Sequence, residues 1–226
     1  MRRGVFIAIL PLLAGCIGSL GGAPSSPYFV SYRTAGRDVI HREAAAGDAD
    51  AQAALGYDYE HGENGLPKRD DEAARFYRLA AEQGNPAGLT NLAVFVATGR
   101  SGRPDDREAA RLLALAAGKG FGPAQVYLSA FYLAGRGGIP DGDPAALAAL
   151  HAVVERDART KFCPESRIVF GAASQYEMGT SRLPRDPSEA IRLYKKLGDP
   201  YPGGCNLENA RERLAEIRGN STTDGQ

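Results

Sequence analysis

Apolar and small residues recur along the chain in four similar segments, each of which ends at a glycine. The segments are residues 51–62, 88–99, 124–135 and 168–179, and their closing glycines stand 37, 36 and 44 residues apart. A spacing of four between larger side chains places them on one face of a helix. Three columns repeat in this way: apolar Leu55, Leu92, Leu128 and Ala172; small Gly56, Ala93, Ser129 and Ala173; and Tyr59, Val96, Tyr132 and Tyr176. Each segment is therefore predicted to be a helix that ends at a left-handed glycine.

A second helix is predicted after each segment, beyond a loop of similar length. We expect the aspartate that follows each loop to cap this helix by accepting bonds from free backbone N–H groups; these residues are Asp70, Asp106, Asp143 and Asp186. Apolar residues then recur at i, i+3 and i+7: Ala74, Tyr77 and Ala81; Ala110, Leu113 and Ala117; Leu147, Leu150 and Val154; Ala190, Leu193 and Leu197. Residues 208–217 predict a more charged closing helix. The predicted fold is all-α, with about four helix pairs and a C-terminal capping helix.

Composition agrees with closely packed helices and excludes some functions. Aromatic residues make up 8% of the 226 residues, tryptophan is absent, and 28 residues are glycine. Lys+Arg and Asp+Glu are both 27, so the chain lacks the basic excess that binding to nucleic-acid phosphates requires. The same balance argues against a polybasic membrane-surface module. With 43% hydrophobic residues the chain has enough apolar side chains for a core.

The N-terminus has the features of a secretion signal. Arg2 and Arg3 precede the nine apolar residues 5–13, which are too few for a helix to span a bilayer. The sequence Leu-Ala-Gly-Cys that ends at Cys16 resembles the lipobox of bacterial lipoproteins. This resemblance implies a signal peptide over residues 1–15 and a lipidated Cys16, and Ile17 after it favours the outer membrane. The alternative is an ordinary secretory signal that is cut elsewhere, with Cys16 discarded.

Residues 16–40 are predicted to be the lipidated cysteine and a flexible tether, because residues 17–27 are rich in Gly, Ser and Pro. The rest of the chain, as far as residue 218, resembles the Sel-one-like repeat, a relative of the tetratricopeptide repeat. Residues 51–84 carry the clearest copy, from the Leu-Gly-x-x-Tyr core to the Ala-Ala-x-x-Gly ending. The resemblance implies a right-handed α/α superhelix whose first helices line a concave surface, in an adaptor for other proteins. Residues 219–226 are predicted to be a disordered tail.

The two remaining cysteines lie about one repeat apart. Cys163 precedes the fourth first helix and Cys205 precedes the closing helix. Equivalent positions of neighbouring repeats lie close together, and a lipoprotein matures in an oxidising compartment, so a disulfide between them is predicted. The alternative is two free thiols. Metal binding is not expected, because no C-x-x-C motif is present and the three histidines are scattered.

No sequence motif indicates catalysis. The chain has no H-E-x-x-H, G-x-S-x-G or phosphate-loop motif, and no serine has a lysine three positions later. The glycine-rich residues 118–122 fall between two helical units, where a repeat boundary is the simpler interpretation. His61 beside Asp58 and Glu60 has the composition of an acid–base pair but is expected on a solvated helix face. We therefore predict no enzyme activity, no cofactor and no metal.

One further column of the first helices is predicted to bind a partner. It contains Asp58, Phe95, Phe131 and Gln175, and it is flanked by Tyr57 and Gln125. Exposed aromatic residues in a groove are natural anchors for a partner segment; the alternative is that both phenylalanines pack between repeats. The predicted function is a monomeric, periplasm-facing adaptor that binds envelope proteins. Two other functions stay open: support of exopolysaccharide or polymer export, and a cell-wall-active or β-lactam-binding enzyme.

Overall fold

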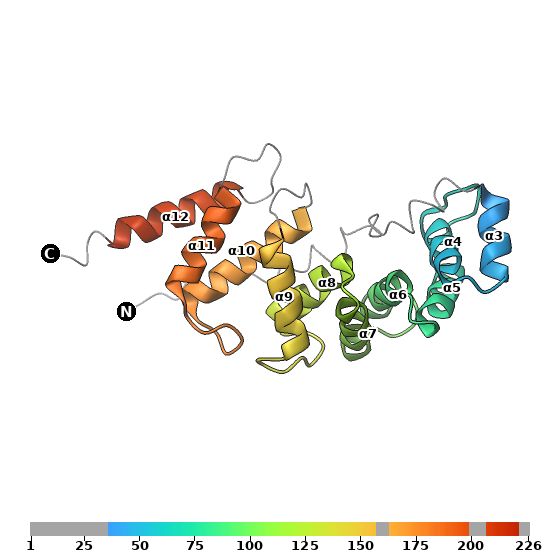
Figure 1. Cartoon of the computed structure of the whole chain (residues 1–226), viewed down its shortest axis with the longest axis horizontal. Coiled ribbons are helices and arrows are strands. Elements are labelled where there is room, and N and C mark those ends of the chain that lie inside the picture. The colour runs from blue at the N-terminus through green and yellow to red at the C-terminus, as the bar shows by residue number, and fades with distance from the viewer. Residues whose placement is uncertain (1–35, 157–162, 199–206, 222–226) are drawn as a thin grey trace. The chain divides into compact units, whose positions relative to one another are not determined.

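A computed structural model describes residues 36–156, 163–198 and 207–221, and all regular structure within these ranges is α-helical (Figure 1). The predicted all-α fold of sequentially paired helices is thereby confirmed. Cys16, Cys205 and the side chain of Cys163 lie outside the described part of the chain. The ten helices in that part are α3 (Arg37–Ala45), α4 (Ala49–His61), α5 (Asp70–Glu82), α6 (Pro86–Thr98), α7 (Asp106–Gly118), α8 (Gly122–Leu133), α9 (Pro144–Glu155), α10 (Cys163–Met178), α11 (Pro187–Gly198) and α12 (Leu207–Ser221).

The contacts divide the folded chain into two units, with the boundary inside α9 between Ala149 and Leu150. In the N-terminal unit each helix from α3 to α8 packs against the next one in the chain. Two further contacts, α4 with α6 and α6 with α8, bring the first helices of successive repeats side by side. In the C-terminal unit α11 packs against both α10 and α12. Each unit is thus built from consecutive helices, as a repeat protein requires.

The repeating columns of the first helices form the core, and the closing glycines turn the chain as predicted. Leu55, its counterparts in the other three repeats and the whole small column are buried. In the tyrosine and valine column, Tyr132 is buried and the others are half-buried. The backbone φ angles of Gly62, Gly99, Gly135 and Gly179 lie between 68° and 76°. This left-handed conformation disfavours a side chain, which is why glycine ends each segment.

The aspartates divide between two roles, so the expected capping is correct in two repeats and wrong in the other two. Asp143 accepts a bond of 2.8 Å from the Ala146 backbone N–H, and Asp186 caps α11 in the same way. In the second repeat, however, the cap is Asp105, which accepts from two backbone N–H groups of the first turn. In the first repeat the N-cap position holds Arg69, which makes no capping bond. Asp70 and Asp106 are the first residues inside their helices, where each binds an arginine described below.

The folded part begins and ends slightly beyond the predicted limits. α3 begins at Arg37, four residues before the predicted start of the repeats, because Ile40 and Ala44 pack in one core cluster with Leu55. α12 ends at Ser221, past the predicted end at residue 218. Its buried Ala210 belongs to a helix that packs against α11, as the predicted capping helix should.

Candidate interaction face and the clamps behind it

The column predicted to anchor a partner lies in the interior of the protein. Phe95 is 0% exposed and Phe131 is 1% exposed, and Asp58 and Gln175 are also buried. The interpretation of the two phenylalanines as exposed anchors is therefore wrong, and the alternative, packing between repeats, is correct. The physical reason is visible at Phe95, whose ring meets the buried ring of Tyr77 from α5 edge-on, with centroids 5.4 Å apart.

This buried column holds the loop that follows each closing glycine. In the first repeat Asp58 accepts a bond of 2.9 Å from the side-chain amide of Asn64, and in the fourth Gln175 accepts one from the Thr180 hydroxyl. In the two middle repeats the column is phenylalanine, and the side chain above it is the arginine that follows the glycine. The same position thus fixes the loop by a hydrogen bond at the ends of the array and by an arginine–aromatic contact in the middle.

Arg100 of the second repeat binds two acidic residues of the first repeat and packs on a phenylalanine of its own repeat. Its guanidinium lies 3.9 Å from the centre of the Phe95 ring. It donates two bonds, of 2.9 and 2.5 Å, to the Asp70 carboxylate and one of 2.5 Å to Glu60. The Arg100 side chain is 28% exposed and that of Glu60 12%, so water screens their attraction only partly. The bond from Arg100 lowers the pKa of Asp70 below its ordinary value. We call this group the Arg100 clamp.

Arg136 forms a smaller clamp between the second and third repeats. It lies 4.5 Å from the Phe131 ring centre and donates two bonds, of 2.8 and 2.5 Å, to Asp106. Its loop packs tightly: a Cβ on Gly137 would come within 2.6 Å of the Cβ of Ala110. Arg136 and Asp106 are 30 residues apart, as are Arg100 and Asp70. The two clamps therefore repeat with the period of the fold.

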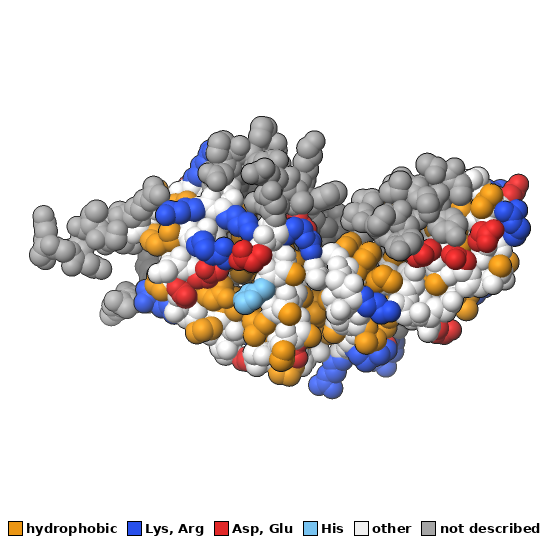
Figure 2. Space-filling view, in the orientation of Figure 1, with side chains coloured by type: hydrophobic (Ala, Val, Ile, Leu, Met, Phe, Trp, Pro, Cys, Tyr) orange, Lys and Arg blue, Asp and Glu red, His pale blue; other side chains and the backbone are white. Residues whose placement is uncertain are grey.

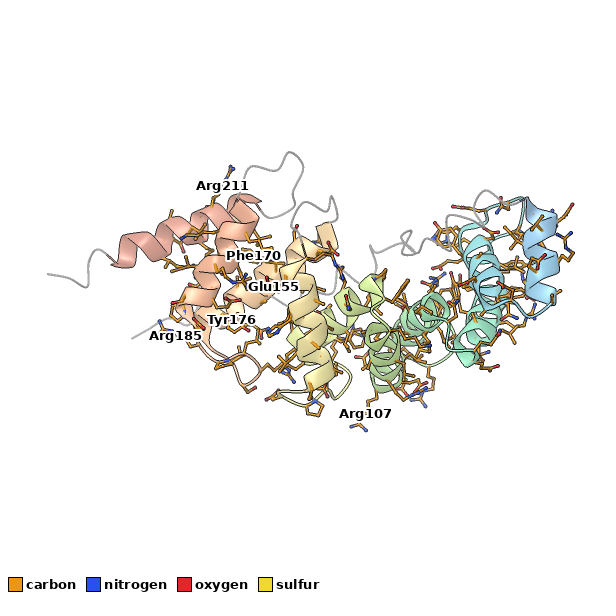
Figure 3. The ribbon with its side chains drawn as sticks, in the orientation of Figure 1. Arg107, Glu155, Phe170, Tyr176, Arg185 and Arg211 are labelled. Atoms are coloured by element: carbon orange, nitrogen blue, oxygen red, sulfur yellow. The ribbon has the colours of Figure 1, made fainter. Side chains whose placement is uncertain are left out.

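A buried tyrosine completes the Arg100 clamp, and the C-terminal unit contains a matching arrangement. Tyr77 donates a bond of 2.7 Å to Glu60, and Tyr194 donates one of 3.0 Å to Glu177. Glu177 also accepts from Arg213 of α12, so α12 is held by the same chemistry that joins repeats. Burial and then the nearby glutamate raise the pKa of both phenols, that of Tyr194 to about 12. Phe170 of α10 lies against Tyr194, with ring centroids 5.5 Å apart (Figure 3).

The raised pKa of Tyr194 predicts an alkaline loss of stability. In the unfolded chain tyrosine ionises near pH 10, so folding favours the protonated phenol. That stabilisation is fully present below pH 10 and is lost as the pH rises toward about 12. We expect the urea midpoint of the wild type to fall over this range, and that of Tyr194→Phe to fall less. An equal fall of the urea midpoint with pH in the two proteins would contradict the assignment of this loss to Tyr194. The matched control is Tyr59→Phe, at a half-buried tyrosine.

Beside the buried column, the first helices carry a second set of positions, of which His61 and Thr98 are exposed. On α6, Asn91, Val94 and Thr98 lie at i, i+3 and i+7, on the side of the helix adjacent to Gly88 and Phe95, which contact α5. Asn91 is buried, Val94 is half-buried and Thr98 is exposed. The positions equivalent to Val94 and Thr98 are Tyr57 and His61 on α4, whose rings stack with centroids 4.0 Å apart. We define the first-helix face as Tyr57, His61, Asn91, Val94, Thr98 and, on α8, Tyr127.

Of the six residues predicted to bind a partner, two flank the buried column. Tyr57 belongs to the first-helix face but is only 8% exposed, and Gln125 is half-buried on α8. Asp58, Phe95, Phe131 and Gln175 serve the loops instead.

The ionisable side chains of the first helix α4 are bonded within the protein. His61 is exposed, and its Nδ1 lies 3.0 Å from the Tyr57 carbonyl oxygen. Glu60 accepts from Tyr77 and Arg100. Within the described residues, no group of three or more His, Cys, Asp and Glu side chains has a metal-binding arrangement. Of the helices in that part of the chain, none is long and apolar enough to cross a membrane.

The outer faces of the second helices carry a different repeating pattern. Three of these helices bear a glutamate and an arginine three residues apart in ion contact, at Glu72 and Arg75, Glu108 and Arg111, and Glu189 and Arg192. α9 has alanine at both equivalent positions, and in Figure 2 hydrophobic side chains, other atoms and a histidine share its visible surface. Arg107 at the start of α7 and Arg211 on α12 point outward from their helices (Figure 3). Exposed pairs of this kind contribute little to stability.

Comparison with known proteins identifies the repeat. The family described as Sel1 repeat matches residues 49–85, 86–121, 122–148 and 171–199. A solved Sel1 repeat protein from Oxalobacter formigenes is 22% identical with a TM-score of 0.52, covering 70% of this chain and 59% of that one. The structure of c5321, described as a protective antigen of uropathogenic Escherichia coli with an SLR fold, is 22% identical with a TM-score of 0.66, covering 92% of this chain and 41% of that one.

These structures show a shared fold, and the chain spans about three fifths and two fifths of their respective lengths. No curated protein matches the chain. The match to the family covers four consecutive units, as many as the closing glycines predicted. The predicted resemblance to Sel-one-like repeats is confirmed.

Proposed function

Because this chain belongs to the Sel1 repeat family, we propose that it is an adaptor that binds another polypeptide through the first-helix face. Sel1 repeats form scaffolds that typically bind proteins. More specifically, we propose that this scaffold is a lipoprotein, acylated at Cys16, that faces the periplasm and binds proteins of the cell envelope.

The observation that carries this proposal is that the side chains that join the repeats are different from those of the first-helix face. The Arg100 and Arg136 clamps occupy the charged and aromatic side chains that join the repeats. The first-helix face lies outside these clamps and combines aromatic, aliphatic and amide side chains. Such a mixture suits an extended or helical polypeptide, which offers both apolar side chains and backbone hydrogen-bonding groups.

The N-terminal sequence supports the proposed position of the chain in the envelope. The lipobox supplies Cys16, whose acyl chains would hold the protein at the membrane. Residues 17–27, rich in Gly, Ser and Pro, provide a tether between the anchor and the helices. A tethered scaffold of this kind raises the local concentration of whatever it binds near the membrane.

Photo-crosslinking in intact cells tests the proposal. A photoreactive residue at Thr98, which is exposed on the first-helix face, should give adducts with one or a few envelope proteins in the membrane fraction. The matched control is Leu115, which is 48% exposed on the outer face of α7 and should give none of these adducts. Cys16→Ser should release the chain from the membrane fraction.

Equal adduct patterns at Thr98 and Leu115 would contradict binding through the first-helix face. A chain that stays in the membrane fraction with Cys16→Ser would contradict the lipid anchor alone.

A further inference from the structure

One buried polar side chain of the first helices has no hydrogen bond. Apart from tyrosines, seven polar or charged residues are buried in the described part of the chain. Six of them form side-chain hydrogen bonds within the protein: Gln52, Asp58, Asn85, Thr90, Ser129 and Gln175. The seventh is Asn91 on α6, which is 9% exposed and whose side-chain amide bonds no described residue. The amide of Asn91 therefore lacks the partner that a buried polar group requires.

Asn91 lies on the first-helix face, where a bound molecule can reach its amide. It stands one turn before the half-buried Val94 and two turns before the exposed Thr98, on the same side of α6. Among the described residues, the amide nitrogen and oxygen of Asn91 are not fully enclosed. The side chain is thus held by its surroundings while both of its bonding atoms stay accessible.

The chemistry of this amide suits the backbone of an extended polypeptide. A carboxamide has N–H donors and a C=O acceptor side by side, and these match the C=O and N–H groups of a peptide backbone. In a helical partner the backbone groups are bonded to one another except at its ends. Only an extended segment presents free backbone groups along its length, with alternate side chains pointing toward the face.

The charge of the first helices indicates which side chains this segment carries. α6 and α8 contain no Lys, Arg, Asp or Glu. The three carboxylates of α4 accept bonds from side chains of the protein itself: Asp50 from Asn85, Asp58 from Asn64, and Glu60 from Tyr77 and Arg100. A charged partner side chain would lose water on these helices without gaining a free counter-charge. The complementary segment is therefore uncharged.

We propose that Asn91 binds the backbone of an extended, uncharged segment of the partner. Its amide nitrogen donates to a carbonyl oxygen of the segment, and its amide oxygen accepts from an N–H group. This inference rests on the proposed function, because it names the class of segment that the first-helix face binds. Val94 and the stacked rings of Tyr57 and His61 belong to the same face and provide apolar contacts for the side chains of the segment.

The first test is Asn91→Leu, which keeps the approximate shape of the side chain and removes its hydrogen-bonding groups. With the photoreactive residue at Thr98, the yield of envelope-protein adducts should fall about tenfold. The free energy of unfolding should stay equal or rise, because the unbound protein loses no hydrogen bond. The control is Gln83→Leu, the same kind of change at an exposed position after α5, which should leave the yield unchanged.

The outcomes separate this inference from the proposed function. Equal yields with and without Asn91→Leu would overturn the role of Asn91 and leave the adaptor function intact. The absence of adducts from Thr98 in both proteins would overturn the adaptor function itself. A lower free energy of unfolding in Asn91→Leu would show that the amide has a structural role, and it would also overturn the proposal.

Synthetic peptides test the backbone bond directly. Linear peptides are selected from a random displayed library on the full chain, and each peptide bond is then replaced in turn by an ester, which removes the N–H donor. At one position the ester should weaken binding severalfold to the chain with Asn91 and leave binding to Asn91→Leu unchanged. Binding should change less than about twofold between low and high salt, because the contact contains no ion pair.

Equal ester effects on the two proteins, or a steep salt dependence, would overturn the proposal. So would a selection that yields no peptide whose binding depends on Asn91. If neutral oligosaccharides bind instead, and Asn91→Leu abolishes their binding, the amide belongs to a saccharide site.

Discussion

Arg100→Ala is expected to lower the free energy of unfolding by about 2–3 kcal/mol, the largest effect of any single arginine described here. The substitution removes three hydrogen bonds and the contact with the Phe95 ring. It also leaves Glu60, which is 12% exposed, without its cationic partner, and burying an uncompensated carboxylate is costly. Urea denaturation of wild type and variant at pH 7 measures the difference.

Two matched arginines calibrate this prediction. Arg111→Ala removes an exposed pair on α7, with 59% of the arginine side chain accessible, and should cost about 0.5 kcal/mol or less. The Arg136 clamp has no counterpart of Glu60. The loss of stability caused by Arg136→Ala should therefore lie between those of the other two variants, at about 1–2 kcal/mol. Equal losses for Arg100→Ala and Arg111→Ala would show that the Arg100 clamp does not join the repeats.

The lowered pKa of Asp70 predicts how the stability difference between wild type and Arg100→Ala depends on pH. Because the Arg100 bond lowers this pKa, the folded state favours the ionised carboxylate. The resulting stabilisation is present above about pH 4, where the unfolded carboxyl ionises, and is lost as the pH falls through the lower folded value. The difference in free energy of unfolding between wild type and Arg100→Ala should therefore become smaller at acidic pH.

Gly88→Ala is expected to destabilise the protein by about 2–3 kcal/mol, although alanine is the better helix former. A Cβ at Gly88 would lie 2.5 Å from the Cβ of Ala80 and 2.9 Å from the backbone nitrogen of Ala81. Both obstacles are close to the main chain of α5 and cannot rotate aside, so α5 and α6 must separate. Thermal and urea unfolding of the variant measure the cost.

Gly118→Ala is the control, because no atom other than those of the neighbouring residues and the backbone of its own helix lies within 4 Å of the added Cβ. This substitution should be neutral or stabilise by up to about 1 kcal/mol through helix propensity. A neutral Gly88→Ala would mean that α5 and α6 are not packed as closely as the structure has them.

The repeating helices were predictable because their signals are local. The spacing of Leu55 and Tyr59 within one helix, and a glycine at the end of it, depend only on the chain within a few turns. The left-handed conformations of the four closing glycines confirm this. Family membership follows from the same local pattern, repeated four times.

The roles of Asp70 and Phe95 were not predictable in this way, because their partners are distant in sequence. Asp70 stands where the repeat pattern predicts an N-cap residue, but its carboxylate binds Arg100, which lies thirty residues later in the chain. Phe95 lies three residues after Leu92, and positions three and four residues on share a helix face. A pattern within one helix therefore cannot show which of two adjacent columns meets Tyr77 of a neighbouring helix. The arginine directly after the closing glycine in the two middle repeats was the one visible signal.

The most direct test of the central claim, that the first-helix face binds a polypeptide while the clamps hold the repeats, is the ratio of partner adducts formed at Thr98 and at Leu115 in the same membranes. Both side chains are exposed, on a first and a second helix of the N-terminal unit. We expect discrete envelope-protein adducts from Thr98 alone. Adducts that form equally from Leu115, or from Leu115 alone, would contradict it.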